Sequence, residues 1–240
     1  MIYYEEHGNK NGKLVVFIHG GFTTSEAFMK QYGLLQEYHC VFVDLPGHGK
    51  SACDRNYRFG FEDAAKAVIE VINFLAPEEK VILISHSYGG LTAKLIMEKM
   101  PERIEKAVIG STNVKKTLLY RLYCGKIGCL LLMLQNRKRY KKENITWKRV
   151  CDSQKSAWLN FNFPKRKIIY EIPALLLYAQ YDIEAIKESM LVWEESFRHS
   201  KLVEIKDAGH NYFWDNSETV NLIVKDFIYG KIKLNTKYIN

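Results

Sequence analysis

The sequence has no long apolar run, no CxxC cysteine pair and no basic, apolar segment in residues 1–6, and each of these features disfavours a class of protein. Its longest aliphatic run, residues 129–134, falls far short of the roughly 20 residues that a membrane-spanning helix needs. Residues 1–6 have neither a basic start nor an apolar core, so we expect no signal peptide. Five cysteines without a CxxC pair favour free thiols in a reducing cytoplasm and predict neither a zinc site nor a disulfide framework.

The positive charge of the chain is concentrated in one segment. Between residues 112 and 172 there are 15 Lys and Arg against three acids, whereas the rest of the chain has 20 bases and 24 acids. We therefore predict a structural insertion with those boundaries, leaving residues 1–111 and 173–240 as the core. No nucleic-acid recognition motif accompanies the excess charge, so we expect no nucleic-acid partner.

Outside this segment, short apolar runs alternate with helical patterns, in a chain that is 47% hydrophobic. We predict parallel strands at residues 14–18, 41–44, 81–84, 107–109, 174–178 and 202–205. We predict helices at residues 24–37, 61–75, 91–100, 185–197 and 218–228. Residues 2–6 are expected to pair antiparallel with residues 14–18. Strands interleaved with helices indicate an α/β fold with a mostly parallel, doubly wound sheet.

The stretch from Ser85 to Gly89 joins the strand at residues 81–84 to the helix at residues 91–100. Its sequence, Ser-His-Ser-Tyr-Gly, has small residues two positions before and after Ser87, as a tight strand-to-helix turn requires. Ser85 stands where glycine is usual. Such a turn exposes Ser87 at the top of a sheet and aims the backbone N–H of Tyr88 at a developing oxyanion.

Three further motifs follow predicted strands. His19-Gly20-Gly21-Phe22 is a glycine-rich turn in which the backbone N–H of Gly21 or Phe22 would supply a second oxyanion donor. Asp182 follows the strand at residues 174–178, and His210 follows the strand at residues 202–205. Carboxyl ends of parallel strands meet at one edge of a sheet, so Ser87, Asp182 and His210 are expected to lie together, in the chain order Ser–Asp–His.

With these motifs in register, the chain resembles the α/β-hydrolase superfamily, in particular its small serine hydrolases with a helical cap, from residue 2 to about residue 228. The resemblance implies Ser87 as nucleophile, His210 as general base and Asp182 as its orienting acid. It places the backbone N–H groups of Gly21, Phe22 and Tyr88 in an oxyanion hole and residues 112–172 in a cap. It also implies a sheet of about seven strands, and no metal or organic cofactor.

Several of these residues also have an ordinary structural interpretation. Ser87 could cap the helix that it precedes, and Asp207 competes with Asp182 as the partner of His210. His19 and His48 lie in structural loops and are expected to bond to backbone, while His86 is expected to point away from the pocket.

Hydrolysis of a carboxylic ester or thioester through an acyl-enzyme is the function that this sequence favours. An aspartate nucleophile, as in dehalogenases and epoxide hydrolases, is excluded by serine at position 87, and Phe22-Thr23 disfavours an iminopeptidase. Two other hypotheses stay open: carbon–carbon hydrolysis by the same triad, and a ligand-binding or signalling protein with little turnover.

Aliphatic residues, basic residues and aromatics gather in the predicted cap. The aliphatic face has Leu118, Leu119, Leu122, Tyr123, Ile127, Leu130, Leu131 and Leu134; residues 137–142 are basic; the aromatics are Trp147, Trp158, Phe161 and Phe163. This composition fits an acyl pocket whose cations attract an anionic small-molecule ester or thioester. It equally fits a monoacylglycerol or lysolipid hydrolase that docks on a membrane through its cap, or a solvated basic helix. The oligomeric state and the identity of the acyl and leaving groups are not encoded in any of these patterns.

Overall fold

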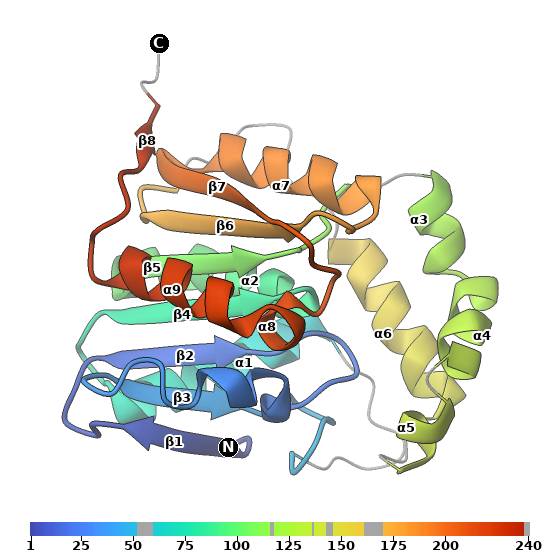
Figure 1. Ribbon diagram of the computed structural model, residues 1–240. Coiled ribbons are helices and arrows are strands. Elements are labelled where there is room, and N and C mark those ends of the chain that lie inside the picture. Colours follow the sequence, from blue (N-terminus) through green and yellow to red (C-terminus); the bar gives the residue numbers. More distant parts are fainter. Residues whose placement is uncertain (52–59, 116–117, 136, 143–145, 161–169, 238–240) are drawn as a thin grey trace.

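One mostly parallel sheet with helices on both faces forms the body of the molecule in this computed structural model (Figure 1). The structure describes residues 1–51, 60–115, 118–135, 137–142, 146–160 and 170–237. The strands are β1 (Tyr4–Gly8), β2 (Leu14–Ile18), β3 (His39–Val43), β4 (Val81–His86), β5 (Ile104–Gly110), β6 (Ala174–Ala179), β7 (His199–Ile205) and β8 (Asn235–Thr236). Their order across the sheet is β1-β3-β2-β4-β5-β6-β7-β8, with the two edge strands antiparallel.

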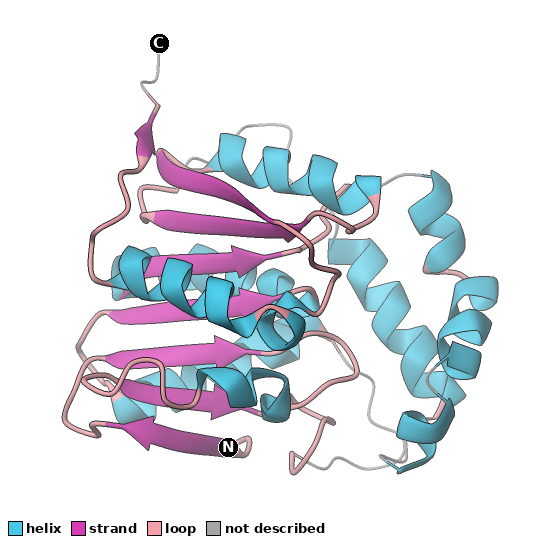
Figure 2. Ribbon diagram, in the orientation of Figure 1, coloured by secondary structure: helices cyan, strands magenta, loops and turns pink. Residues whose placement is uncertain are grey.

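Helices cover both faces of this sheet, as Figure 2 shows. The helices outside the predicted insertion are η1 (Ser25–Gln31), α1 (Phe61–Leu75), α2 (Tyr88–Lys99), η2 (Pro101–Arg103), α7 (Glu184–Ser196), α8 (Tyr212–Asp215) and α9 (Ser217–Ile228). Side chains of β2 alternate between the two layers. Leu14, Val16 and Ile18 pack with α1, α2 and α7, whereas Val15 and Phe17 pack with η1, α8 and α9. The predicted doubly wound α/β sheet is therefore confirmed.

The predicted partner of the first strand was wrong. β1 pairs with β3, from Tyr4 opposite Val43 to Gly8 opposite His39, and not with β2. The reason is that β2 has β3 and β4 as parallel neighbours on its two sides, so only the outer side of β3 is open to an edge strand. Among the described residues the sheet has eight strands, in line with the prediction of about seven. The strand β8 was not predicted, because it is only two exposed residues long and has no apolar pattern.

The predicted helix at residues 24–37 is shorter and tighter than expected. It is the 3₁₀ helix η1, which begins after Thr24, whose side-chain oxygen accepts a hydrogen bond from the Glu26 N–H at 3.3 Å. Phe28 within it has a non-helical φ of −110°, and its ring is buried against the sheet. After η1 the chain continues through turns and not as a helix to residue 37. These turns place Leu35 in the same core layer as Phe28.

Four helices are formed by the described residues between β5 and β6. They are α3 (Leu118–Tyr123), α4 (Lys126–Gln135), α5 (Arg137–Lys142) and α6 (Trp147–Asn160). In Figure 1 they stand beside the carboxyl ends of the parallel strands, with α6 between α4 and the sheet. A small apolar cluster joins them to the core, since Phe22 packs with Cys129, Tyr140 and Val150. That residues 112–172 form a separate cap remains a prediction, and Phe161 and Phe163 lie outside the described residues.

Among the described residues, no helix is long and apolar enough to cross a membrane. Within the same residues, no group of three or more His, Cys, Asp or Glu side chains is arranged to hold a metal ion. The four cysteines in the described part of the chain, Cys40, Cys124, Cys129 and Cys151, are free thiols.

Candidate active site

The turn between β4 and α2 holds Ser87 in a backbone conformation that few residues adopt. Its φ is +53° and its ψ is −122°, and its N–H donates to the Gly110 carbonyl oxygen at 2.7 Å. A non-glycine residue in this region costs on the order of 1–3 kcal/mol and is retained where the surroundings enforce it. Here the surroundings are close, because a Cβ at Gly89 would stand 2.2 Å from the Ile18 carbonyl oxygen.

Serine fits at position 85, the first small position of the turn, as well as the usual glycine would. Its side chain is buried, and its hydroxyl donates to the Val108 carbonyl oxygen on β5 at 3.0 Å. A buried hydroxyl with a partner carries no penalty for an unmade hydrogen bond. The departure from the usual glycine is therefore compatible with the same turn.

Side chains that follow three different strands meet in front of this turn. The Oγ of Ser87 lies 3.0 Å from the Nε2 of His210, which follows β7. The Nδ1 of His210 lies 2.7 Å from the Oδ1 of Asp182, which follows β6. Because a carboxylate only accepts, the imidazole proton belongs on Nδ1, which leaves Nε2 able to accept the Ser87 hydroxyl. Asp207, the competing acid, is exposed and is not a contact of the imidazole among the described residues.

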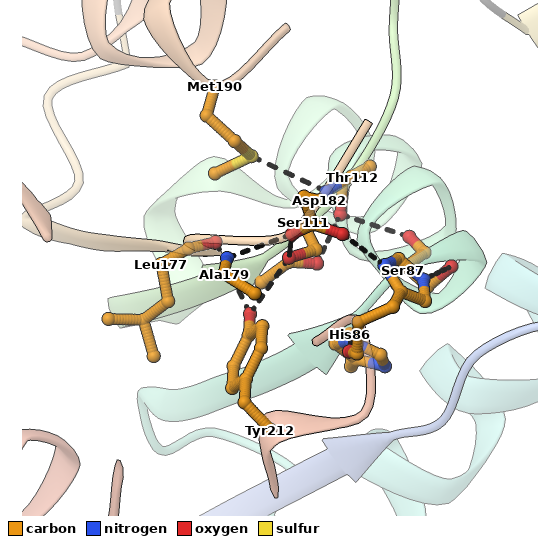
Figure 3. Close-up of polar contacts among 11 residues, drawn as sticks. His86, Ser87, Ser111, Thr112, Leu177, Ala179, Asp182, Met190 and Tyr212 are labelled. Atoms are coloured by element: carbon orange, nitrogen blue, oxygen red, sulfur yellow. Dashed lines mark hydrogen bonds and ion pairs between the residues drawn. The ribbon is translucent and has the colours of Figure 1, made fainter. Parts of the chain in front are cut away.

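The Asp182 carboxylate is buried and fully engaged. Its Oδ2 accepts hydrogen bonds from the Ser111 hydroxyl at 2.5 Å and from the Ala179 N–H at 2.8 Å (Figure 3). Burial alone would raise the pKa of Asp182, but the hydrogen bonds from His210, Ser111 and Ala179 outweigh it and leave that pKa lowered. The acid is therefore held ionised beside the imidazole.

Sequence reasoning missed Ser111 and its neighbour Tyr212. Ser111 follows the last residue of β5 and has a φ of +41°, which turns its side chain toward Asp182. The Tyr212 hydroxyl donates to the Leu177 carbonyl oxygen at 3.2 Å and lies 3.4 Å from the Ser111 oxygen. The one sequence signal for Ser111 is its position directly after a strand that ends at the same sheet edge. Serines at such positions are too common for this signal to single out Ser111.

The loop after β2 approaches the turn closely because it is glycine-rich. A Cβ at Gly20 would stand 3.1 Å from the Cβ of Ser87, and one at Gly21 would stand 2.6 Å from the Tyr88 ring. The backbone N–H of Tyr88 lies at the first position of α2, where the N–H groups of a helix point toward negative charge. For the Gly21 N–H, the described residues include no hydrogen-bond acceptor.

Phe22, the other predicted donor of this loop, is already engaged. Its φ is +57°, and its N–H donates to the Nε2 of His48 at 3.2 Å. His48 in turn donates from Nδ1 to the Pro46 carbonyl oxygen at 3.1 Å. Of the two predicted donors of this loop, Gly21 and Phe22, Gly21 is therefore the better candidate to donate its N–H to an oxyanion.

His19 holds the same loop from the other side. Its Nδ1 donates to the Gly20 carbonyl oxygen at 2.7 Å, and its Nε2 accepts from the Leu45 N–H at 3.0 Å. Burial lowers the pKa of His19 to about 4, so the imidazole is neutral and can both donate and accept. His19 and His48 thus bond to backbone, in agreement with the expectation that neither acts in catalysis.

His86 does not point away from the pocket. Its ring is buried against the ring of His210, with 4.8 Å between the centroids, and its Nε2 donates to the His210 carbonyl oxygen at 2.8 Å. Burial and the neighbouring His210 lower the pKa of His86 to about 3, so it is neutral. Its place is beneath His210, where it fixes the loop that carries the imidazole.

A cavity of about 380 Å³ opens above Ser87. Phe22, Tyr88 and Ile186 contribute to its wall, as do Leu132, Tyr140 and Gln154 from the helices between β5 and β6. The Tyr88 hydroxyl donates to the Gln154 side-chain oxygen, which links α2 to α6 beside the cavity. None of the described residues that line it is Lys or Arg. Polar and apolar groups both contribute substantially to the cavity wall.

Comparison with known proteins points in one direction. A family model described as the alpha/beta hydrolase family matches residues 15–120. A protein of Arabidopsis thaliana provisionally named methylesterase 12, chloroplastic, is 38% identical over 98 residues, which are 40% of this chain and 28% of that protein. Polyneuridine aldehyde esterase of Rauvolfia serpentina is 34% identical over 104 residues, 42% of this chain and 39% of that protein. The chain thus spans well under half the length of these curated relatives.

The likeness of the fold extends over nearly the whole chain. A thermophilic esterase from Thermogutta terrifontis, solved with malate bound, superposes with a TM-score of 0.74 at 19% sequence identity. The superposition covers 96% of this chain and 93% of that one. At this level of identity the likeness concerns the fold alone.

Proposed function

We propose that this chain, which belongs to the α/β-hydrolase superfamily, hydrolyses a carboxylic ester through an acyl-enzyme on Ser87. One observation carries the proposal. The Ser87 Oγ lies 3.0 Å from an imidazole nitrogen whose ring is fixed by a buried carboxylate 2.7 Å away on its other side. A serine hydroxyl is a poor nucleophile until a neighbouring base takes its proton, and this arrangement supplies that base.

The residues have distinct roles in the proposed reaction. The Ser87 oxygen attacks the ester carbonyl carbon while His210 takes the hydroxyl proton on Nε2, and Asp182 stabilises the resulting imidazolium. The carbonyl oxygen becomes an oxyanion between the N–H groups of Gly21 and Tyr88, each worth about 3 kcal/mol in the transition state. His210 then gives its proton to the departing alkoxide, leaving an acyl group on Ser87.

Water completes the cycle by the same route. His210 takes a proton from a water molecule, whose oxygen attacks the acyl carbon, and returns that proton to the Ser87 oxygen as the acid departs. All proton transfers use the one imidazole, and the proposed chemistry requires no metal and no organic cofactor. A thioester would follow the same steps with a thiolate as the leaving group.

The cavity favours a compact, uncharged ester as the substrate. Its volume of about 380 Å³ is at the lower end of the range for small-molecule sites. The lining from Phe22, Leu132 and Ile186 suits an apolar acyl or alkyl group. The absence of Lys and Arg from the described lining speaks against a substrate chosen for its negative charge. The esterase names of the two sequence relatives support the same substrate class.

Turnover of a series of p-nitrophenyl esters from acetate to palmitate, beside short and long acyl-CoAs, tests the proposal. We expect hydrolysis of the short-chain esters, abolished in Ser87→Ala. Ser85→Ala is the matched control, because the Ser85 hydroxyl points to β5 and its loss should leave turnover within about a factor of two. Turnover that persists in Ser87→Ala would overturn the proposal.

The same assay separates the other hypotheses. Absence of turnover across the series, with Ser87 still labelled by a fluorophosphonate, would indicate a ligand-binding protein in place of an esterase. A carbon–carbon hydrolase would also label without ester turnover, and would be recognised by cleavage of a β-diketone instead.

A further inference from the structure

Among the described side chains of α3 and α4, six large aliphatic ones are exposed. On α4 they are Ile127, Leu130, Leu131 and Leu134, each 49–67% exposed. Their spacing of three and four residues places them on one side of the helix. On α3, Leu118 and Leu122 are 75% and 54% exposed and are four residues apart. We call these six residues the outer patch.

The outer patch does not serve the packing of α4 on the rest of the molecule. The opposite side of α4 already does so, because Cys129 is buried and Leu132 and Met133 pack with Phe22 and Val150. In Figure 1, α6 lies between α4 and the sheet. The packed residues of α4 and its exposed leucines are different side chains, so the outer patch is left uncovered by the described residues. Soluble proteins seldom leave a contiguous apolar face of this kind exposed unless something binds there.

Exposed cations flank the outer patch along the chain. Lys126 opens α4, and Arg137, Lys138 and Lys141 follow on α5, all exposed. Among the described side chains of α3–α6, Asp152 is the single acid, so the local charge is strongly positive. These cations do not serve the cavity, whose described lining has no Lys or Arg. Their position beside exposed leucines calls for a partner that is both apolar and anionic.

A bilayer with anionic lipids provides both properties over one flat surface. Short amphipathic helices bind such a surface by inserting aliphatic side chains at the headgroup boundary while Lys and Arg contact the phosphates. We propose that the outer patch and the cations around it dock the protein on an anionic membrane, with α3 and α4 lying in the interface. This docking is independent of the ester chemistry at Ser87 and would bring the cavity, lined by Leu132 on the inner side of α4, close to esters dissolved in the membrane.

Sedimentation with vesicles tests the docking directly. The full chain should bind vesicles of phosphatidylcholine with about one third phosphatidylserine at 0.15 M salt, bind pure phosphatidylcholine far more weakly, and be released by 1 M salt. Leu130→Ser/Leu134→Ser should lower the partition coefficient at least tenfold. Arg137→Gln/Lys138→Gln/Lys141→Gln should lower it about 100-fold on anionic vesicles only, at roughly fivefold per cation.

The matched control is Leu222→Ser, which removes an equally exposed leucine from α9 on the body of the molecule and should leave vesicle binding unchanged. None of the altered residues lines the cavity, so all variants should keep wild-type turnover of p-nitrophenyl acetate without vesicles, which also shows that they fold. If the protein shows no esterase activity but binds vesicles in this pattern, the docking proposal is still supported.

Three results of the vesicle assay would overturn the proposal. They are equal binding to neutral and anionic vesicles, no binding to either, and binding that the leucine variant does not reduce. A wild-type dimer in solution that Leu130→Ser/Leu134→Ser dissociates would show that a second copy, and not a membrane, covers the outer patch.

Discussion

Replacement of Asp182 by asparagine is predicted to inactivate the protein by reversing the tautomer of His210. The Oδ2 position of residue 182 receives the Ala179 N–H at 2.8 Å and the Ser111 hydroxyl at 2.5 Å. A backbone N–H can only donate, so the asparagine must place its carbonyl oxygen there. The opposite orientation would leave two buried donors facing each other, at a cost of about 1–3 kcal/mol for each unsatisfied group.

The side-chain NH₂ of the asparagine then faces the Nδ1 of His210, at the position where the carboxylate oxygen stood 2.7 Å away. Since that NH₂ donates, Nδ1 must accept, and the imidazole proton moves to Nε2. An Nε2–H cannot take the proton of the Ser87 hydroxyl, so we expect kcat to fall about 10⁴-fold, or about 5.5 kcal/mol in the barrier.

Steady-state hydrolysis of the best p-nitrophenyl ester measures this loss, and ¹⁵N shifts of the histidine nitrogens report the tautomer. Asp207→Asn is the matched control. Asp207 lies three residues before His210, is exposed, and has a φ of +51° that asparagine tolerates, so its kcat should stay within about twofold of the wild type. A loss of less than tenfold in Asp182→Asn, or an equal loss in Asp207→Asn, would refute the assignment of the orienting acid.

Backbone fit and buried histidines give two further predictions. Gly89→Ala, whose Cβ would stand 2.2 Å from the Ile18 carbonyl oxygen, should lower the free energy of unfolding by about 1–3 kcal/mol in thermal denaturation. The control Gly209→Ala, whose Cβ would meet nothing within 4 Å, should melt like the wild type. Equal melting temperatures for the two variants would contradict the close packing at Gly89. Burial lowers the pKa of His19 to about 4 and of His86 to about 3, so below pH 6.5 only the unfolded chain binds these protons. Urea titrations should therefore show the free energy of unfolding falling between pH 6 and pH 5 by about 1.2 kcal/mol per histidine. His86→Asn should remove one such contribution, and an unchanged slope would show that His86 is not the group that resists protonation.

The sequence was most informative where function depends on the ends of parallel strands. Ser87, Asp182 and His210 each follow an apolar run, and parallel strands direct their carboxyl ends to one edge of the sheet. Their proximity could therefore be expected from order alone, and the structure brings them within hydrogen-bond reach. Whether they catalyse remains a prediction for the assays above.

Other features depend on geometry that sequence does not display. The contact of Ser111 with Asp182 and the contact of Phe22 with His48 both follow from positive φ angles at ordinary residues. Positive φ is rare outside glycine, so no residue pattern suggests it. The pairing of β1 was missed for a different reason. A hairpin with the next strand is the local expectation, but the filled edges of β2 are a property of the whole sheet.

The distribution of the three residues over β4, β6 and β7 also governs when the site first exists during synthesis. Ser87 is synthesised long before His210. At a synthesis rate of roughly 5–20 residues per second, the two are separated by on the order of ten seconds. In that interval the elbow can form against β2 and β5, yet its hydroxyl has no base. If the proposed mechanism holds, a nascent chain would therefore be unreactive toward esters until β7 has joined the sheet.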